Sequence, residues 1–225
     1  MVLQGRKMIV LTILASGNGS NFENLVERLH GRRLGEVRGL CPGLGEVRGL
    51  DSKTLHVSSL ICNKADAFVL TRASNLGIPS YVIESKGRTR DEFEGKLFER
   101  LDGLKADGLS MILLAGFMRI LSPSFFQRGL GLPMLNIHPS YLPLHKGAGA
   151  IEKSFYDSRD FGGVSVHEVS SEVDSGRLIL QEKLLKIPGE GLDGFSLRIH
   201  SLERDIYPRA IVKFIYESRR FHETS

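Results

Sequence analysis

The chain has 225 residues, of which 41% are hydrophobic and 25% charged, the composition of a soluble globular protein. No apolar run is long enough to cross a bilayer, and the net charge of +4 is spread along the chain, so neither a membrane nor a nucleic-acid partner is expected. Cys41 and Cys62 are too few for a disulfide framework, and the seven histidines lack a metal-binding spacing. We therefore expect a cytoplasmic protein without a metal.

Strands and helices are predicted to alternate along most of the chain. Apolar runs predict strands at 8–15, 55–62, 78–84, 109–116 and 134–138. Apolar residues at helical spacing and start signals predict helices from 20 to 30, from 65 to 77, from 89 to 104 and after Ser122. This alternation indicates parallel strands joined by right-handed crossovers.

The C-terminal part follows a different pattern. The segments GVSVHEV and RLILQEKLLKI lie close together and predict an antiparallel pair of strands, and residues 192–218 predict a closing helix bent near Pro208. We expect one Rossmann-like α/β domain over 1–225. Its sheet would be twisted and mostly parallel, with an antiparallel C-terminal pair and helices on both faces.

A glycine-rich turn, SGNGSN, joins the first strand to the first helix. Ser20 and Glu23 have the spacing of an N-cap and its capping box. Phe22 stands where a dinucleotide-binding loop has its third glycine, and no Gly-Lys-Ser/Thr follows, so neither a dinucleotide nor an ATP loop fits. The backbone N–H groups of Gly19, Ser20 and Asn21 suit a phosphate monoester at a helix N-terminus, and a capped turn without a ligand is the alternative.

The heptapeptide LGEVRGL occurs twice between the first helix and the second strand, at 34–40 and 44–50. Two copies are too few for a repeat fold. We interpret 34–50 as an inserted, glycine-rich surface loop that carries a tandem duplication. Because this segment lies away from the carboxyl ends of the strands, we expect it to be dispensable for activity.

The sequence NIHPSYLP places two polar side chains at the end of the fifth strand. Asn136 and His138 are two residues apart and therefore share a face of the strand, at the edge where open α/β sheets bind ligands. A carboxamide and an imidazole can stabilise an oxyanion, and no nucleophile motif accompanies them, so the substrate is expected to supply the nucleophile. Asp174 in EVDSG is either a turn residue or a carboxylate that reaches His138 and favours its protonated form.

These motifs together resemble the phosphoribosylglycinamide formyltransferases, a family of folate-dependent enzymes. The resemblance runs from Met8 to about Tyr216 and rests on SGNGSN, NKADAF, LAGFMRIL, NIHPSYLP and SSEVDSG. It implies a transfer of the formyl group from the co-substrate 10-formyltetrahydrofolate to the amine of glycinamide ribonucleotide in purine biosynthesis. It also implies direct attack by the amine, no bound cofactor, and a monomer or homodimer.

The resemblance assigns roles to individual residues. It implies catalysis by Asn136, His138 and Asp174. The implied ribonucleotide site consists of Gly19, Ser20, Asn21 and Glu203. The implied folate site consists of Arg90, Met118, Arg119, Ile120, Leu121, Asn136, Ser170, Ser171, Glu172, Val173 and Asp174.

Two alternatives stay open at this point. A deformylase of the same superfamily would use water as the nucleophile, and a non-catalytic protein would only bind folate or a nucleotide. The loop LHKGAGAIEKSF, from Leu144 to Phe155, departs from the family's commoner proline-glycine version. We expect this departure to change the detail of the loop and not the class of reaction.

Overall fold

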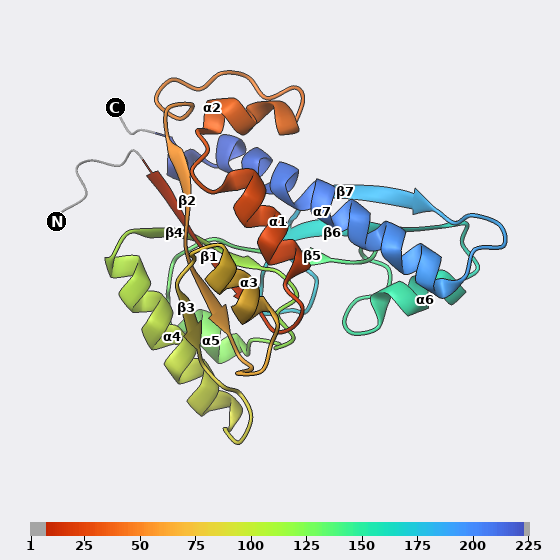
Figure 1. Ribbon diagram of the computed structural model, residues 1–225, viewed down its shortest axis with the longest axis horizontal. Helices are drawn as coiled ribbons and strands as arrows, with labels where there is room; N and C mark the ends of the chain where they lie inside the picture. The colour runs from red at the N-terminus through yellow and green to blue at the C-terminus, as the bar shows by residue number, and fades with distance from the viewer. Residues whose placement is uncertain (1–7, 223–225) are drawn as a thin grey trace.

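The computed structural model describes residues 8–222, which are built around one twisted sheet (Figure 1). The strands of the described part are β1 (Met8–Ala15), β2 (Thr54–Cys62), β3 (Ser80–Val82), β4 (Leu109–Leu114), β5 (Met134–His138), β6 (Phe161–Glu168) and β7 (Leu178–Leu185). Their spatial order is β3-β2-β1-β4-β5-β6-β7. The first five pair in parallel, whereas β6 is antiparallel to both β5 and β7. The predicted sheet is confirmed, and the β5–β6 pair adds an antiparallel contact.

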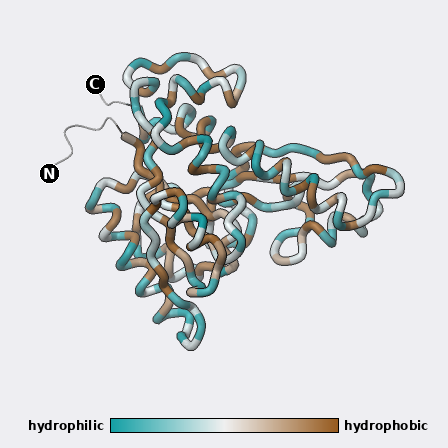
Figure 2. Tube along the Cα trace, in the orientation of Figure 1, coloured by the Kyte–Doolittle hydropathy of each residue, from teal (hydrophilic) through white to brown (hydrophobic). Residues whose placement is uncertain are grey.

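Helices cover both faces of the sheet, as predicted. They are α1 (Ser20–Leu29), α2 (Leu34–Val37), α3 (Val69–Asn75), α4 (Arg90–Ala106), α5 (Pro123–Gln127), α6 (Ala150–Tyr156) and α7 (Leu192–Glu217), with 3-10 turns η1 (Arg38–Leu40) and η2 (Arg219–Phe221). Figure 1 shows α4 and α5 on one face and α1, α3 and α7 on the other, and the buried apolar residues accordingly form two clusters. The hydropathy colouring in Figure 2 shows the same core, with apolar segments along the strands.

The closing helix α7 passes through Pro208 without ending there. A proline in a helix leaves the carbonyl four residues earlier without its usual N–H donor. That carbonyl belongs to Arg204, and it accepts a hydrogen bond from Asn24 Nδ2 of α1 at 2.8 Å. The neighbouring helix therefore satisfies the group that the proline leaves free, and it ties α1 to α7.

The predicted N-cap of α1 is wrong. Gly19, not Ser20, precedes the helix, and its φ of 82° is left-handed, so no side chain caps the first turn. Ser20 is the first helical residue. The Glu23 carboxylate does not close a capping box but pairs with Arg72 of α3. The glycine conformation required by the turn thus replaces the side-chain cap suggested by the residue spacing.

Two other helix starts agree with their sequence signals. Thr89 precedes α4, and its hydroxyl accepts from the Glu92 backbone N–H while the Glu92 side chain returns to the Thr89 N–H, a capping box. Ser122 caps α5 by accepting from the Phe125 N–H at 3.3 Å. The helix predicted from 65 to 77 is shorter in the structure, where only Val69–Asn75 is helical.

The two copies of LGEVRGL adopt different structures, so the expectation of a loop over 34–50 is wrong for the first copy. The first copy forms α2 and η1, whereas the second has no regular structure. Leu34 and Val37 of the first copy and Leu50 of the second belong to the main core. Apolar residues at every third position of each copy point inward, which explains why the segment packs on the core. Figure 1 shows it beside the C-terminal end of α7, far from α6.

Candidate active site

A cavity of about 740 Å³ lies at the carboxyl ends of β1, β4 and β5. This is the edge at which parallel α/β sheets bind ligands, where the connections on either side of β1 diverge. The walls come from the glycine-rich turn after β1, the loop after β4, the end of β5, the segment before α6, the β6–β7 connection and α7. The lining residues of these segments include 16–21, 114–121, 136–139, 147–151, 169–174, His167, His200 and Glu203.

The glycine-rich turn is held against α3. The Val69 N–H donates to the Gly17 carbonyl at 3.1 Å, and the Arg72 guanidinium donates to the Asn18 carbonyl at 3.0 Å. A Cβ on Gly19 would lie 2.4 Å from a methyl group of Val69, and its φ is positive, so the position requires glycine. A Cβ on Gly17 would meet nothing within 4 Å. The turn is therefore fixed from behind and open toward the cavity.

The centre of the cavity holds four polar side chains from β5, β6 and the β6–β7 connection. Asn136 pairs with His167 across the antiparallel β5–β6 ladder, and Asn136 Nδ2 lies 3.2 Å from His167 Nε2. The Asp174 carboxylate lies 3.3 Å from His138 Nδ1 and 3.4 Å from His167 Nε2. An amide has two N–H bonds, so Asn136 keeps one donor for a ligand. The four groups form one connected cluster.

Both ring nitrogens of His138 face acceptors. Nδ1 faces the Asp174 carboxylate, and Nε2 lies 2.9 Å from the backbone carbonyl of His145. Carboxylate and carbonyl oxygens only accept hydrogen bonds, so each ring nitrogen faces a group to which an N–H could donate. The His138 side chain is 8% exposed and that of Asp174 is 10% exposed, which strengthens their interaction relative to water.

Asp174 is held as a carboxylate. Burial raises its pKa, but the neighbouring His167 ring, the Gly147 N–H that donates to Oδ2 at 2.8 Å and the charge on His138 outweigh this effect. The pKa of Asp174 consequently lies below its usual range. Its backbone has a left-handed φ of 48°, a conformation that aspartate tolerates better than most residues.

A second ionisable pair lies on α7 at the wall of the same cavity. His200 Nδ1 donates to Glu203 Oε2 at 2.7 Å, and this hydrogen bond raises the pKa of His200. Glu203 is buried, whereas His200 is about half exposed. The pair gives this wall a histidine that keeps its proton to higher pH than a free one.

Comparison with known proteins identifies the family. The formyl transferase family model matches residues 8–211. The phosphoribosylglycinamide formyltransferase of Escherichia coli K12 is 32% identical over 216 residues, covering 96% of this chain and 91% of the relative. The chain belongs to the phosphoribosylglycinamide formyltransferase family. The enzyme of Campylobacter jejuni is similar in structure, with a TM-score of 0.78, 37% identity and coverage of 92% of this chain and 98% of that one. The enzyme of Streptococcus pneumoniae is also similar in structure, with a TM-score of 0.74, 31% identity and coverage of 91% of this chain and 97% of that one.

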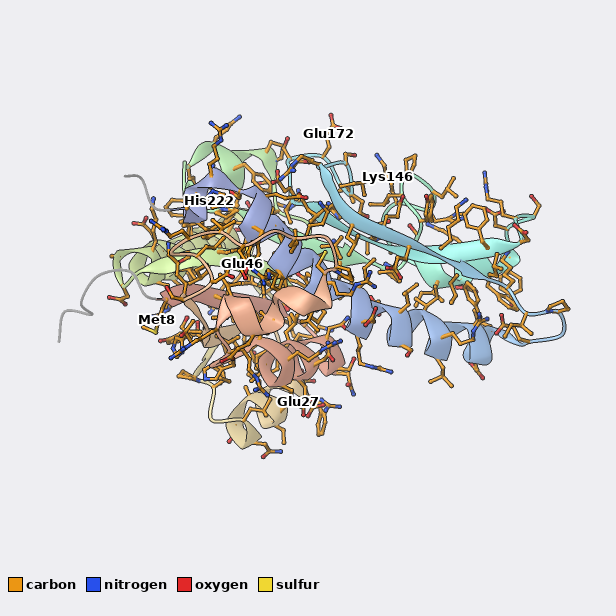
Figure 3. The ribbon with its side chains drawn as sticks, turned by 90° about the horizontal axis from the view of Figure 1, so that it is seen from above. Met8, Glu27, Glu46, Lys146, Glu172 and His222 are labelled. Atoms are coloured by element: carbon orange, nitrogen blue, oxygen red, sulfur yellow. The ribbon has the colours of Figure 1, made fainter. Side chains whose placement is uncertain are left out.

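Most residues that the family resemblance implied line one cavity. These are Gly19, Ser20, Asn21, Glu203, Met118, Arg119, Ile120, Leu121, Asn136, His138, Ser170, Ser171, Glu172, Val173 and Asp174. Arg90 is not among them, because it begins α4 and is exposed. Figure 3 labels Glu172 and Lys146 at the same margin of the molecule, and the hydrogen bond from Lys146 to Ser175 links their two segments.

The sequence reasoning missed several lining residues. His167 pairs with Asn136, yet only the β5–β6 register brings the two together. Lys64 and Asn18 also line the cavity, beside the glycine-rich turn. A lysine after the second strand, in NKADAF, was the available signal for a cation at this edge.

Residues 8–222 contain neither an arrangement of metal ligands nor a membrane-spanning helix. Within this range no group of three or more histidine, cysteine or carboxylate side chains is arranged to hold a metal ion. No helix of this part of the chain combines the length and the apolar character that a membrane span requires. Cys41 and Cys62 are both buried and free.

Proposed function

We propose that this chain transfers the formyl group of 10-formyltetrahydrofolate to the amine of glycinamide ribonucleotide. The observation that carries the proposal is the juxtaposition, in one cavity, of the Asn136, His138 and Asp174 cluster with an open glycine-rich turn at a helix N-terminus. The cluster suits an oxyanion, and the turn suits the phosphate of the acceptor. The family relationship supports the same reading.

The two substrates would enter the cavity from different walls. We propose that Gly19, Ser20 and Asn21 bind the ribonucleotide phosphate through backbone N–H groups and that Glu203 faces the glycinamide end. The segment from Met118 to Leu121 and the segment from Ser170 to Asp174 would hold the folate. Met118 and Ile120 are largely exposed, 72% and 60%, so they offer apolar surface for a flat ring to cover.

The reaction needs no covalent intermediate on the protein. The amine attacks the formyl carbon, and a carbon–nitrogen bond forms as the carbonyl electrons move to the formyl oxygen. Asn136 and His138 donate hydrogen bonds to this oxyanion, and the carboxylate of Asp174 keeps His138 cationic. The intermediate collapses when the bond from the formyl carbon to the folate nitrogen breaks. That nitrogen takes up a proton, while the former amine loses one.

Holding both substrates in one cavity accounts for a large part of the expected rate. An intramolecular-like arrangement removes the entropic cost of bringing two reactants together. A deformylase would differ only in the nucleophile, since water would replace the amine. The open glycine-rich turn favours the transferase, because a deformylase has no need of a phosphate site.

The experiment is an assay of 10-formyltetrahydrofolate with and without glycinamide ribonucleotide. The proposal predicts that loss of the formyl group depends on the ribonucleotide and stops when the ribonucleotide is consumed. Release of formate at the same rate without ribonucleotide would identify a deformylase instead. Binding of either compound without turnover would identify a non-catalytic binding protein.

A further inference from the structure

His145 contacts the catalytic cluster through its backbone and a distant carboxylate through its ring. It lies between β5 and α6, in the loop whose sequence departs from the family's usual pattern. Its carbonyl accepts from His138 Nε2 at 2.9 Å, and its own ring Nε2 lies 2.8 Å from Asp157 Oδ2. The backbone of His145 is left-handed, with a φ of 51°, which is uncommon for a residue other than glycine.

The Asp157 carboxylate, which contacts the His145 ring, is itself held in place by other contacts. Asp157 is the C-cap residue of α6, and its side chain is 7% exposed. Its Oδ1 accepts from the Arg159 backbone N–H at 2.7 Å, and its carbonyl accepts from Lys186 Nζ at 2.6 Å. The Arg159 guanidinium pairs with the same carboxylate from the solvent side, since 45% of that side chain is exposed. His145 is therefore anchored to a fixed point.

The anchor matters because an unfavourable backbone conformation persists only where its surroundings hold it. The direction of the His145 carbonyl depends on that conformation. Without the ring contact, the backbone of His145 is expected to relax to a negative φ, which turns the carbonyl away from His138. The His138 ring would then keep its contact with Asp174 but lose the acceptor at Nε2.

We propose that the His145–Asp157 pair positions the catalytic His138 by fixing the carbonyl that receives its Nε2–H; this inference rests on the proposed formyl transfer. The carbonyl and Asp174 together hold the ring in one plane. A neutral carbonyl is a weaker acceptor than an oxyanion. The substrate oxygen therefore draws the Nε2–H to itself as it gains negative charge, which stabilises the transition state more than the ground state.

The loop has other attachments that do not involve the His145 ring. Ser140 Oγ donates to the Leu144 carbonyl at 2.6 Å, and Lys146 Nζ donates to Ser175 Oγ at 2.6 Å. The Gly147 N–H remains bound to Asp174. Removal of the ring should thus disturb one carbonyl and leave the course of the loop intact.

The kinetic test compares four proteins: wild type, His145→Ala, His145→Gln and Arg159→Ala. His145→Ala should lower kcat roughly ten- to a hundredfold, the scale of a small misplacement of a catalytic group, with both KM values nearly unchanged. His145→Gln should recover most of the lost kcat, because its amide can donate to Asp157. Arg159→Ala is the matched control, since it removes the other side chain that pairs with the Asp157 carboxylate, and should stay near wild type.

A second measurement does not depend on turnover. The ring N–H signals of His138 in the substrate-free protein can be assigned by NMR from their absence in His138→Ala. Wild type and His145→Gln should show a protected Nε2–H signal, and His145→Ala should lose it by exchange with water. An unchanged Nε2–H signal in His145→Ala, or an unchanged kcat, would overturn the positioning role. If wild type lacked transferase activity while the signal still required His145, only the proposed function would fail.

Discussion

Asp174 lies between two histidines and keeps a negative charge although its side chain is only 10% exposed. Replacing it with asparagine keeps the volume but removes the charge that favours the His138 cation. We expect Asp174→Asn to lower kcat by on the order of a hundred- to a thousandfold, as for other losses in oxyanion stabilisation. Both KM values should change much less, because the interaction matters mainly in the transition state. Steady-state kinetics and a thermal melt measure this, and a folded variant within about threefold of wild type would exclude the role.

The same cluster predicts non-additive effects. His138→Ala should be about as harmful as Asp174→Asn, because each removes the same imidazolium. The double mutant should lose less than the product of the two single effects, since residues that act as a unit do not contribute independently. Independent, multiplicative losses in kcat would show that Asp174 acts on something other than His138.

The His200–Glu203 pair predicts a pH dependence of ribonucleotide binding. The hydrogen bond to Glu203 raises the pKa of His200 in the folded protein. The stability contributed by this pair is therefore fully present below the unfolded pKa and is lost as pH rises through the folded pKa. Because a cation that lines the same cavity favours an anionic ligand, the KM for the ribonucleotide should rise over the same window. His200→Gln should give a flatter KM profile, and identical profiles in both proteins would contradict this.

Site residues could be predicted from the sequence only where they lie within a short motif. Asn136 and His138 could be predicted because two residues on one strand must share a face. His167 could not, since its place opposite Asn136 depends on the antiparallel β5–β6 register. The role of His145 could not be predicted either, because its backbone carbonyl makes the contact with His138, and no pattern of side chains indicates such a contact.

At the scale of the element, the turn between β1 and α1 offers a paired test of phosphate binding. Gly17 has open space where a Cβ would lie, so Gly17→Ala should fold normally and crowd the cavity. We expect a higher KM for the ribonucleotide and an unchanged KM for the folate. Gly19→Ala is the contrasting variant, because its Cβ would collide with Val69 and its φ is positive; it should lower the melting temperature. Equal effects of Gly17→Ala on both KM values would remove the turn from the phosphate site.

The elements differ in how far the sequence predicts them. Long apolar runs become buried strands with nearly the predicted bounds, because a strand covered on both faces must be apolar throughout. The start of α1 was misplaced, since the spacing of Ser20 and Glu23 cannot reveal that Gly19 adopts a left-handed turn. Helix α6 was not foreseen, because its seven residues lie in a glycine-containing loop and are ordered by contacts with α7 and β6.

At the scale of the whole molecule, the repeated segment supports stability at the end of the fold opposite the site. Asp51, which follows it, accepts from Arg38 at 2.8 Å and from the Tyr216 hydroxyl at 2.7 Å. These contacts join the first copy of the repeat to the end of α7. That the segment is dispensable for activity stays a prediction: deletion of 41–50 should leave turnover near wild type, although it should lower the free energy of unfolding.

The corresponding positions of the two copies provide a matched pair of substitutions. Leu50 is 1% exposed in the core, whereas its counterpart Leu40 is only partly buried. Leu50→Ala should reduce the free energy of unfolding by about 2–5 kcal/mol, and Leu40→Ala by clearly less, with kcat unchanged in both. Denaturant unfolding and steady-state kinetics provide the two readouts. A loss of kcat in folded Leu50→Ala would show that the segment influences the site.

The fate of the formyl carbon distinguishes formyl transfer to the ribonucleotide from release of formate. 10-Formyltetrahydrofolate labelled with carbon-13 in the formyl group is mixed with enzyme and an equimolar amount of glycinamide ribonucleotide, and carbon-13 NMR follows the label. We predict that the label moves into the amide of the formylated ribonucleotide, with little free formate, and that Asp174→Asn slows this transfer by on the order of a hundred- to a thousandfold. Label that accumulates as formate, at a rate independent of the ribonucleotide, would contradict it.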